Sequence, residues 1–148
     1  PSYQNIDPKN IPEFKDQEKK IKIIAGKFQN KTGPAKGFVD PIYLDIELKK
    51  RKNFIYTIPT SHNAFIYLVA GEIKIGNKAH SKLENSTLIN LKNGDKLKIS
   101  TVEKSKFLVI AGKPINEPIA RGGPFVMNTK QEILKAVQDY HSGNFVQK

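Results

Sequence analysis

Hydrophobic and polar residues alternate along two neighbouring stretches of the chain, residues 42–48 and 53–58. In the first stretch isoleucine and leucine occupy every second position, and tyrosine or a carboxylate occupies each position between them. A period of two is typical of a β-strand with one face buried and the other face in water. The pattern therefore predicts two strands that each present an apolar face to a core.

Further strands are predicted along the rest of the chain. Residues 64–75 are apolar on both faces as far as Val69, which predicts an inner strand followed by a turn or bend at Gly71. The other predicted strands cover residues 21–28, 86–91, 95–101 and 106–112. About seven short strands with turns roughly every 8–12 residues are typical of an all-β protein, an antiparallel sandwich or barrel.

The end of the chain has a different pattern. Residues 113–128 are rich in proline and glycine, which predicts an extended crossing segment. Thr129, with Glu132 three residues later, forms the capping-box pattern of a helix start, and Gly143 is placed to end the helix. The apolar positions at helical spacing are Ile133, Val137 and Tyr140. This single amphipathic helix must pack its apolar face on the barrel or on a neighbouring domain.

We expect one domain with three parts: a linker or edge segment at 1–18, a barrel at 19–112, and the crossing segment with its helix at 113–148. The chain does not begin with methionine, so we expect it to be part of a longer protein. It has no cysteine, no apolar run of about 20 residues and no signal-peptide pattern at its start. We therefore expect a cytoplasmic protein, or a nuclear one in a eukaryote, with no membrane partner.

The formal charge of +11 raises the question of a nucleic-acid partner. Only Arg51 and Arg121 are arginines, the residues best suited to bidentate phosphate or base recognition. The densest basic cluster, KKRK at 49–52, lies between two predicted strands and is expected at a hairpin tip. Lysines spread along strands are typical of a solvated face, so we do not expect nucleic acid to be the partner. Any such binding would be an unspecific electrostatic surface.

A barrel of this kind also raises the question of a metal site. The cupin superfamily holds its metal with an H-x-H pair and a glutamate ahead of a glycine, and with a histidine from a second motif. When Gly71 is placed at that glycine, the ligand positions are occupied by Thr57, Pro59 (or Thr60), Ala64 and Leu97. Proline, alanine and leucine side chains cannot ligate a metal. We therefore expect no metal and no cofactor in this chain.

The three histidines are far apart in the sequence. His62 comes just before the strand at 64–75, and we expect a loop histidine bonded to the backbone, with a place in a small ligand cavity as the alternative. His80 is expected in a surface turn, and His141 at a helix C-terminus, where positive charge suits the dipole. Ser61 beside His62 is not a triad, because triad members face one another across a fold. We predict no catalytic residues.

Phe125 and Met127 alternate with Val126 just before the helix. One interpretation is that they complete the core of this domain. The alternative is that the segment and the helix pack across an interface to another domain. The candidates for that interdomain contact are Phe125, Met127, Ile133 and Val137.

Several phrases of the chain together resemble the C-terminal half of the pirins, two-domain proteins of the cupin superfamily. The phrases are PSYQ (1–4), IAGKF (24–28), GPAKGF (33–38), PIYLDIEL (41–48), HNAFIYLVAGEI (62–73) and KPINEPIARGGPFVMNTKQEILKAVQDYHSGNF (113–145). The last is the most specific. The departures are local: KKRKN at 49–53 replaces a Pro-Gly type turn, and Thr60-Ser61 replaces an acidic-glycine pair.

The resemblance implies a cupin barrel, or double-stranded β-helix, with one C-terminal helix. It also implies that a metal, usually iron, is bound in the N-terminal half, where quercetin oxygenation is located. We therefore expect a metal-free domain with a structural or interaction role, packed against a metal-bearing N-terminal cupin domain. This chain would not be an enzyme by itself.

The first alternative is that the parent protein is an iron-dependent quercetin (flavonol) 2,3-dioxygenase with its active site in the N-terminal half. The second is a transcription-cofactor or nucleic-acid-associated role from the basic surface. The resemblance also implies a regulatory or metabolic protein as a further partner.

Overall fold

A computed structural model describes residues 4–76, 86–92 and 94–146 of the chain. The chain forms two compact units, Pro1–Pro114 and Ile115–Lys148. The division lies close to position 113, where the sequence predicts the crossing segment to start. No helix in the described ranges is long and apolar enough to cross a membrane.

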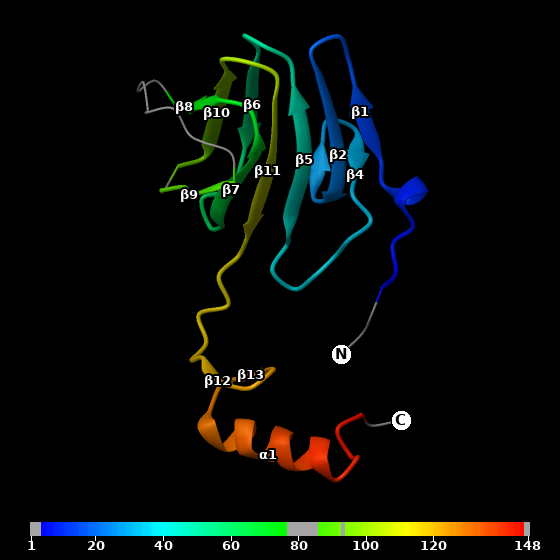
Figure 1. The fold of residues 1–148 in the computed structure, drawn as a ribbon, viewed down its shortest axis with the longest axis vertical. Helices are drawn as coiled ribbons and strands as arrows, with labels where there is room; N and C mark the ends of the chain where they lie inside the picture. The colour runs from blue at the N-terminus through cyan, green and yellow to red at the C-terminus, as the bar shows by residue number, and fades with distance from the viewer. Residues whose placement is uncertain (1–3, 77–85, 93, 147–148) are drawn as a thin grey trace. The chain divides into compact units, whose positions relative to one another are not determined.

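The first unit is built mainly from two antiparallel sheets, of six and three strands (Figure 1). The six-stranded sheet has the order β1-β2-β5-β11-β7-β9. Its strands are β1 (Glu13–Lys15), β2 (Lys19–Ala25), β5 (Ile42–Leu48), β7 (Asn63–Ala70), β9 (Thr87–Asn90) and β11 (Ser105–Gly112). The three-stranded sheet, of order β6-β10-β8, consists of β6 (Asn53–Thr57), β8 (Ile73–Ile75) and β10 (Lys96–Thr101). The 3₁₀ turn η1 (Pro8–Asn10) precedes β1, and β3 (Lys27–Phe28) pairs with β4 (Lys31–Thr32).

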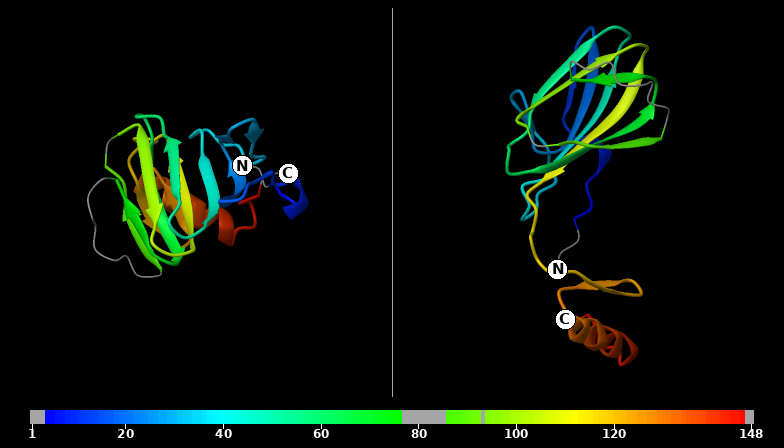
Figure 2. Two further views of the ribbon diagram at one scale, coloured as in Figure 1. Left: turned by 90° about the horizontal axis from the view of Figure 1, so that it is seen from above. Right: turned by 90° about the vertical axis from the view of Figure 1, so that its left-hand side faces the viewer.

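The two sheets curve around one hydrophobic core (Figure 2). Strand β5 illustrates how each strand contributes to this core: its isoleucines and leucines are buried, and the residues between them are partly exposed. On that outer face Asp45 lies 3.5 Å from Lys106, and Glu47 lies 3.8 Å from Lys104. Largest among the fully buried side chains are Phe54 of β6 and Phe107 of β11, one from each sheet. The prediction of an all-β antiparallel fold with alternating strands is confirmed.

The strand order shows where β7, the 49–52 segment and the first residues of the chain lie relative to the two sheets. β7 lies between β11 and β9, so the prediction of an inner strand there is confirmed. The prediction of a hairpin tip at 49–52 is wrong, because β5 pairs with β2 and β11, whereas β6 pairs with β10. The segment at 49–52 instead carries the chain from one sheet to the other. The first part, predicted as a linker or edge segment, contributes the edge strand β1.

The second unit is a hairpin that packs on a helix. β12 (Ala120–Gly122) and β13 (Phe125–Met127) pair through a tight turn in which Gly123 has a φ of 54°. The sequence predicted only an extended crossing here and missed this hairpin. Helix α1 (Lys130–His141) starts with the predicted capping box: the amide of Glu132 donates to the Thr129 hydroxyl, and the amide of Thr129 donates to the Glu132 carboxylate at 2.7 Å.

The turn between β1 and β2 leads to a prediction about pH. The ammonium of Lys19 and the amides of Glu18 and Lys19 all donate to the carboxylate of Asp16. The Lys19 side chain, with the two amides, lowers the pKa of Asp16 from 3.8 to about 2. Since the pKa is depressed, the stabilisation is present above pH 3.8 and is lost as the pH falls through about 2.

We expect an NMR titration of the Asp16 carboxyl carbon to have its midpoint near pH 2. In Lys19→Ala the midpoint should move up, and in Lys15→Ala, which removes an exposed lysine of β1, it should stay in place. A midpoint near 3.8 in the unmodified chain would contradict the assigned contacts.

Candidate functional site

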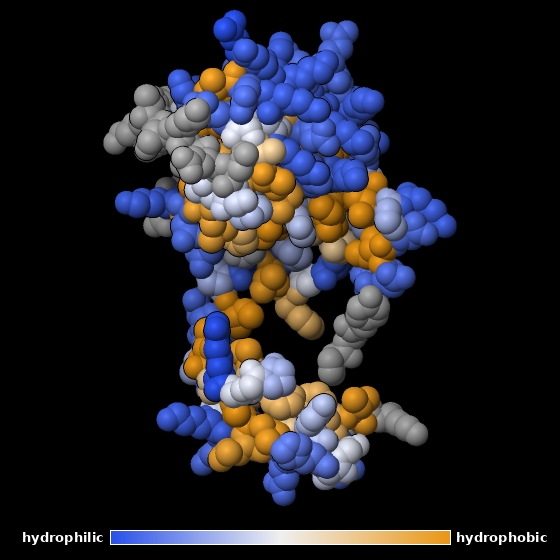
Figure 3. All heavy atoms as spheres, viewed as in Figure 1, coloured by the Kyte–Doolittle hydropathy of each residue, from blue (hydrophilic) through white to orange (hydrophobic). Residues whose placement is uncertain are grey.

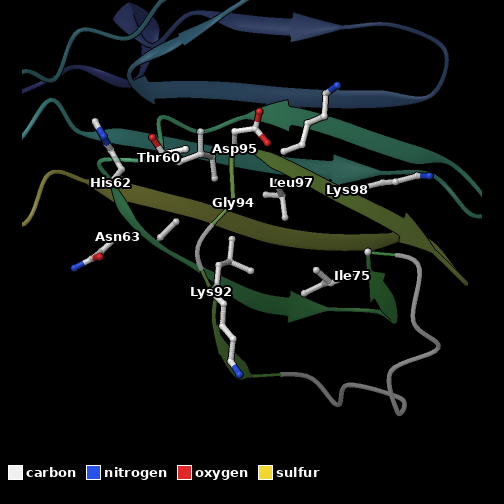
Figure 4. Close-up of a pocket in the computed structure, with 14 residues that line it drawn as sticks. Thr60, His62, Asn63, Ile75, Lys92, Gly94, Asp95, Leu97 and Lys98 are labelled. Carbon is white, nitrogen blue, oxygen red and sulfur yellow. The ribbon is translucent and has the colours of Figure 1, made fainter.

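A small cavity opens between the strands at one end of the first unit (Figure 4). Its volume is about 230 Å³. The apolar part of its lining consists of Ile58, Ala64, Ile75, Leu91 and Leu97, and the polar part of Thr60, His62, Asn63, Lys92, Asp95, Lys96 and Lys98. Leu97 and Ile75 lie at its centre, whereas the amines of Lys92 and Lys98 extend outwards. The interior is therefore mainly apolar, and most of the charge is at the rim.

Three of the positions that the cupin metal motif assigns to ligands line this cavity: Thr60, Ala64 and Leu97. Thr57 and Pro59 instead line a wider neighbouring groove of about 750 Å³. Alanine and leucine have no donor atom, and a threonine hydroxyl is not among the usual ligands of iron or zinc. Within the part of the chain that the structure describes, no three His, Cys, Asp or Glu side chains are grouped to hold a metal. The residues present do not fit a cupin metal.

His62 lines both the cavity and the groove, and both of its ring nitrogens have partners. Its Nε2 lies 2.9 Å from the carbonyl oxygen of Asp40, which can only accept, so Nε2 carries the proton. In the neutral ring Nδ1 then accepts from the Ser61 hydroxyl at 3.2 Å. A metal or a substrate proton would have to displace one of these bonds. This geometry agrees with the interpretation of His62 as a loop histidine bonded to the backbone.

Asp40 was not among the residues singled out from the sequence, yet side chains from two distant segments contact it. Besides the His62 contact at its carbonyl, its carboxylate accepts from the ammonium of Lys113. This hydrogen bond lowers the pKa of Asp40. Asp40 has a left-handed φ of 46°, which aspartate tolerates better than most residues. The Asp-Pro pair at 40–41 is a turn signal, but neither partner could be predicted from it.

Among the described residues that line the cavity, His62 is the one histidine. His141 is the last residue of α1, in the second unit, and His80 lies outside the described residues. Because His62 is the one histidine at the cavity and both its nitrogens are engaged, the described lining holds no free general base of this type.

The four residues proposed for an interdomain contact all belong to the second unit. Ile133 is 9% exposed and packs on Gly122, where an added Cβ would lie 2.4 Å from its Cγ2. The ring of Phe125 lies 5.1 Å from that of Phe145 and 6.1 Å from that of Tyr140. Met127 and Val137 are half-buried. The sequence did not reveal that Phe145 joins this cluster, because it lies beyond the helix.

The second unit also leaves large apolar side chains in water, visible as orange spheres around its helix (Figure 3). They include Leu134 at 70% and Val126 at 62% exposure. Exposed apolar side chains gathered on so small a unit are typical of a surface that another element covers.

Comparisons with known proteins agree with one another. The model of the pirin C-terminal cupin domain matches residues 43–146. A pirin-like protein of Solanum lycopersicum is 34% identical over 97% of this chain and 50% of its own length, and human pirin is 30% identical over 96% of this chain and 50% of its own length. The crystal structure of a quercetin 2,3-dioxygenase from Acinetobacter baumannii matches with a TM-score of 0.87 and 33% identity, over 97% of this chain and 50% of that one. The chain spans about half the length of the relatives it matches.

Proposed function

Because the chain belongs to the pirin family through its C-terminal cupin domain, we propose that it is the metal-free half of a two-cupin protein. In this role it packs against an N-terminal cupin domain that holds iron, and it shapes or shields that site. The contribution of this chain is structural and interactive rather than catalytic.

The observation that carries this proposal is the composition of the cavity at the end of the barrel. Ala64 and Leu97 stand where a cupin metal would need ligands, and both ring nitrogens of His62 are occupied. The match to half the length of the relatives supports the presence of a second domain. The exposed apolar residues of the second unit, together with Phe125, Met127, Ile133 and Val137, supply candidate contacts with it.

Iron content tests the proposal. After anaerobic incubation with ferrous iron and removal of the excess, we expect the isolated chain to retain close to none. We expect a chimera, in which this chain replaces the half of the Acinetobacter protein that it matches, to be soluble and to retain about one iron per molecule. The remaining Acinetobacter half expressed alone is the control, and it should be less soluble and less stable than the chimera.

Two outcomes would contradict the proposal. About one iron per isolated chain would show that His62 recruits ligands outside the set described above. A chimera no more soluble or stable than the Acinetobacter half alone would show that this chain does not pack on such a domain.

A second candidate function rests on the name of the Acinetobacter relative, quercetin 2,3-dioxygenase. In this version the parent protein oxygenates a flavonol, and this chain is a necessary part of the enzyme without touching the reacting atoms. The chimera would then consume quercetin while the isolated chain would not. Turnover by the isolated chain would contradict both candidate functions.

A further inference from the structure

The outer face of the three-stranded sheet gathers positive charge from segments far apart in the sequence. The contributing side chains, which we call the basic face, are Lys50, Arg51, Lys74, Lys96 and Lys98, and all five are exposed. Lys74 of β8 pairs with Ser100 of β10. Lys98 lies two positions before Ser100 on β10, so its side chain projects from the same face as that of Ser100. Hydrophilic residues cover the end of the unit from which the 49–52 segment projects (Figure 3).

Several lysines on the outer face of the six-stranded sheet are paired with carboxylates. On the outer face of the six-stranded sheet Lys20 lies 2.9 Å from Glu13, and Lys106 lies 3.5 Å from Asp45. No member of the basic face has such a carboxylate partner among the described residues. The strands β6, β8 and β10 contain no aspartate or glutamate. The described carboxylates that flank them in sequence are Glu72 before β8, and Asp95 and Glu103 on either side of β10. Among the described residues no ion pair therefore neutralises these five cations, although Glu103 lies at the edge of the face.

The end of the basic face is held in a fixed shape by Thr101, whose side chain is buried. Its hydroxyl donates to the carbonyl of Lys49 at 2.6 Å and accepts from the amide of Lys52 at 3.1 Å. The amide of Arg51 donates to the carbonyl of Thr101 at 3.1 Å. A hollow of about 430 Å³ results, lined by Lys50, Arg51, Lys74, Ser100, Thr101, Val102 and Glu103. These bonds hold the backbone from which the Lys50 and Arg51 side chains project.

The scattered lysines of the sequence did not predict a nucleic-acid partner, but their gathering on one face changes that expectation. We propose that the basic face binds the phosphate backbone of nucleic acid without reading its sequence. Lysine, arginine, serine, threonine and asparagine are the side chains that contact phosphates. The outward positions of β6 and β10 add hydroxyl and amide groups of these types, from Asn53, Thr57 and Ser100. Sequence readout would need an element that enters a groove, and the outer face of this short, three-stranded sheet presents none.

The composition of the basic face argues against two other kinds of negatively charged partner, an acidic protein and an anionic membrane surface. The core of a protein interface is rich in aromatic residues and depleted in lysine, the reverse of what this face presents. Binding in a membrane surface would need several large apolar side chains to insert, whereas Ile55 is the one large exposed apolar side chain on the described outer face of this sheet. A phosphate backbone needs only spaced positive charge and hydrogen-bond donors.

Fluorescence anisotropy with a labelled 20-base-pair DNA duplex tests the proposal across a series of salt concentrations. If all five cations neutralise phosphates, the logarithm of the binding constant should fall with the logarithm of salt concentration with a slope of about −4.5. The double variant Lys74→Glu/Lys98→Glu should bind about tenfold or more weakly at low salt, with a slope reduced in magnitude by about 2. Both positions are exposed, and an unchanged melting temperature would verify folding.

The matched control is Lys15→Glu/Lys22→Glu. It changes the net charge equally, but at exposed lysines of β1 and β2 in the other sheet. We expect at least a fivefold smaller loss of affinity in this control, because the effect belongs to the face rather than to the total charge. An equal loss in both variants would overturn the proposal, as would no binding of the duplex at low salt. Binding to anionic vesicles without binding to the duplex would also overturn it.

Discussion

Replacing Phe54 with alanine will lower the free energy of unfolding of the first unit by about 3–5 kcal/mol. Phe54 is 2% exposed and lies where the two sheets face each other. Its ring lies 6.0 Å from that of Phe107, in an edge-to-face arrangement, and 6.1 Å from those of Phe28 and Tyr56. The variant loses both the buried area and these ring contacts, and leaves a cavity between rigid strands.

Urea denaturation followed by circular dichroism measures this loss. The matched control is Ile55→Ala, one residue along the same strand, whose side chain is 57% exposed on the outer face. We expect that variant to lose less than about 1 kcal/mol. Similar losses in the two variants would mean that β6 does not face the core as described.

The second large effect is expected at Gly71, the bend between β7 and β8. A Cβ added there would lie 2.4 Å from the Ser105 hydroxyl and 2.6 Å from the carbonyl oxygen of Lys104, and the φ of 91° is unfavourable for alanine. Ser105 cannot easily give way, because its hydroxyl bonds both the amide and the carbonyl of Glu72 at 3.0 Å. We expect Gly71→Ala to cost about 3–5 kcal/mol, from overpacking together with backbone strain.

Gly76 separates the two causes. It also has a positive φ, 68°, but an added Cβ would meet nothing within 4 Å. Gly76→Ala should therefore lose only the backbone contribution, about 1 kcal/mol, in the same denaturation experiment. If Gly71→Ala were no more destabilising than Gly76→Ala, the close approach of the bend to Ser105 would be wrong.

The alternating strands and the helix start could be predicted from the sequence because their causes are local, whereas the short β12–β13 hairpin was missed. The alternation along 42–48 places its apolar residues toward a core whichever strands lie beside them. The capping box of Thr129 and Glu132 involves only one turn of chain. In each case the residues that determine the structure lie within a few positions of one another.

Partners across the fold could not be predicted in this way. Alternation says which face of a strand is buried, but it does not say which strand lies beside it. The 49–52 segment was therefore predicted as a hairpin tip, although it passes between the sheets. The His62 contact with Asp40 spans 22 positions and depends on how two loops meet.

For the candidate site, too, only the features that depend on residue type could be predicted from the sequence. The lack of metal ligands was evident from residue types alone, because alanine and leucine have no donor atom wherever they lie. The basic face was not evident, because strand register brings Lys74 beside Ser100, and the sequence shows only an excess of lysine. Whether those lysines have carboxylate partners is a property of the folded sheets.

The position of β11 in the large sheet affects how the first unit folds during its synthesis. β11 lies between β5 and β7 in the middle of the large sheet, yet it is the last strand of that sheet in the chain. Its pairing with β5 joins residues about 60 positions apart, and such distant pairing slows folding. During synthesis the inner edges of β5 and β7 stay unpaired until residues 105–112 leave the ribosome. Exposed strand edges attract other chains, so this interval is when a nascent chain is most prone to aggregate and most dependent on chaperones.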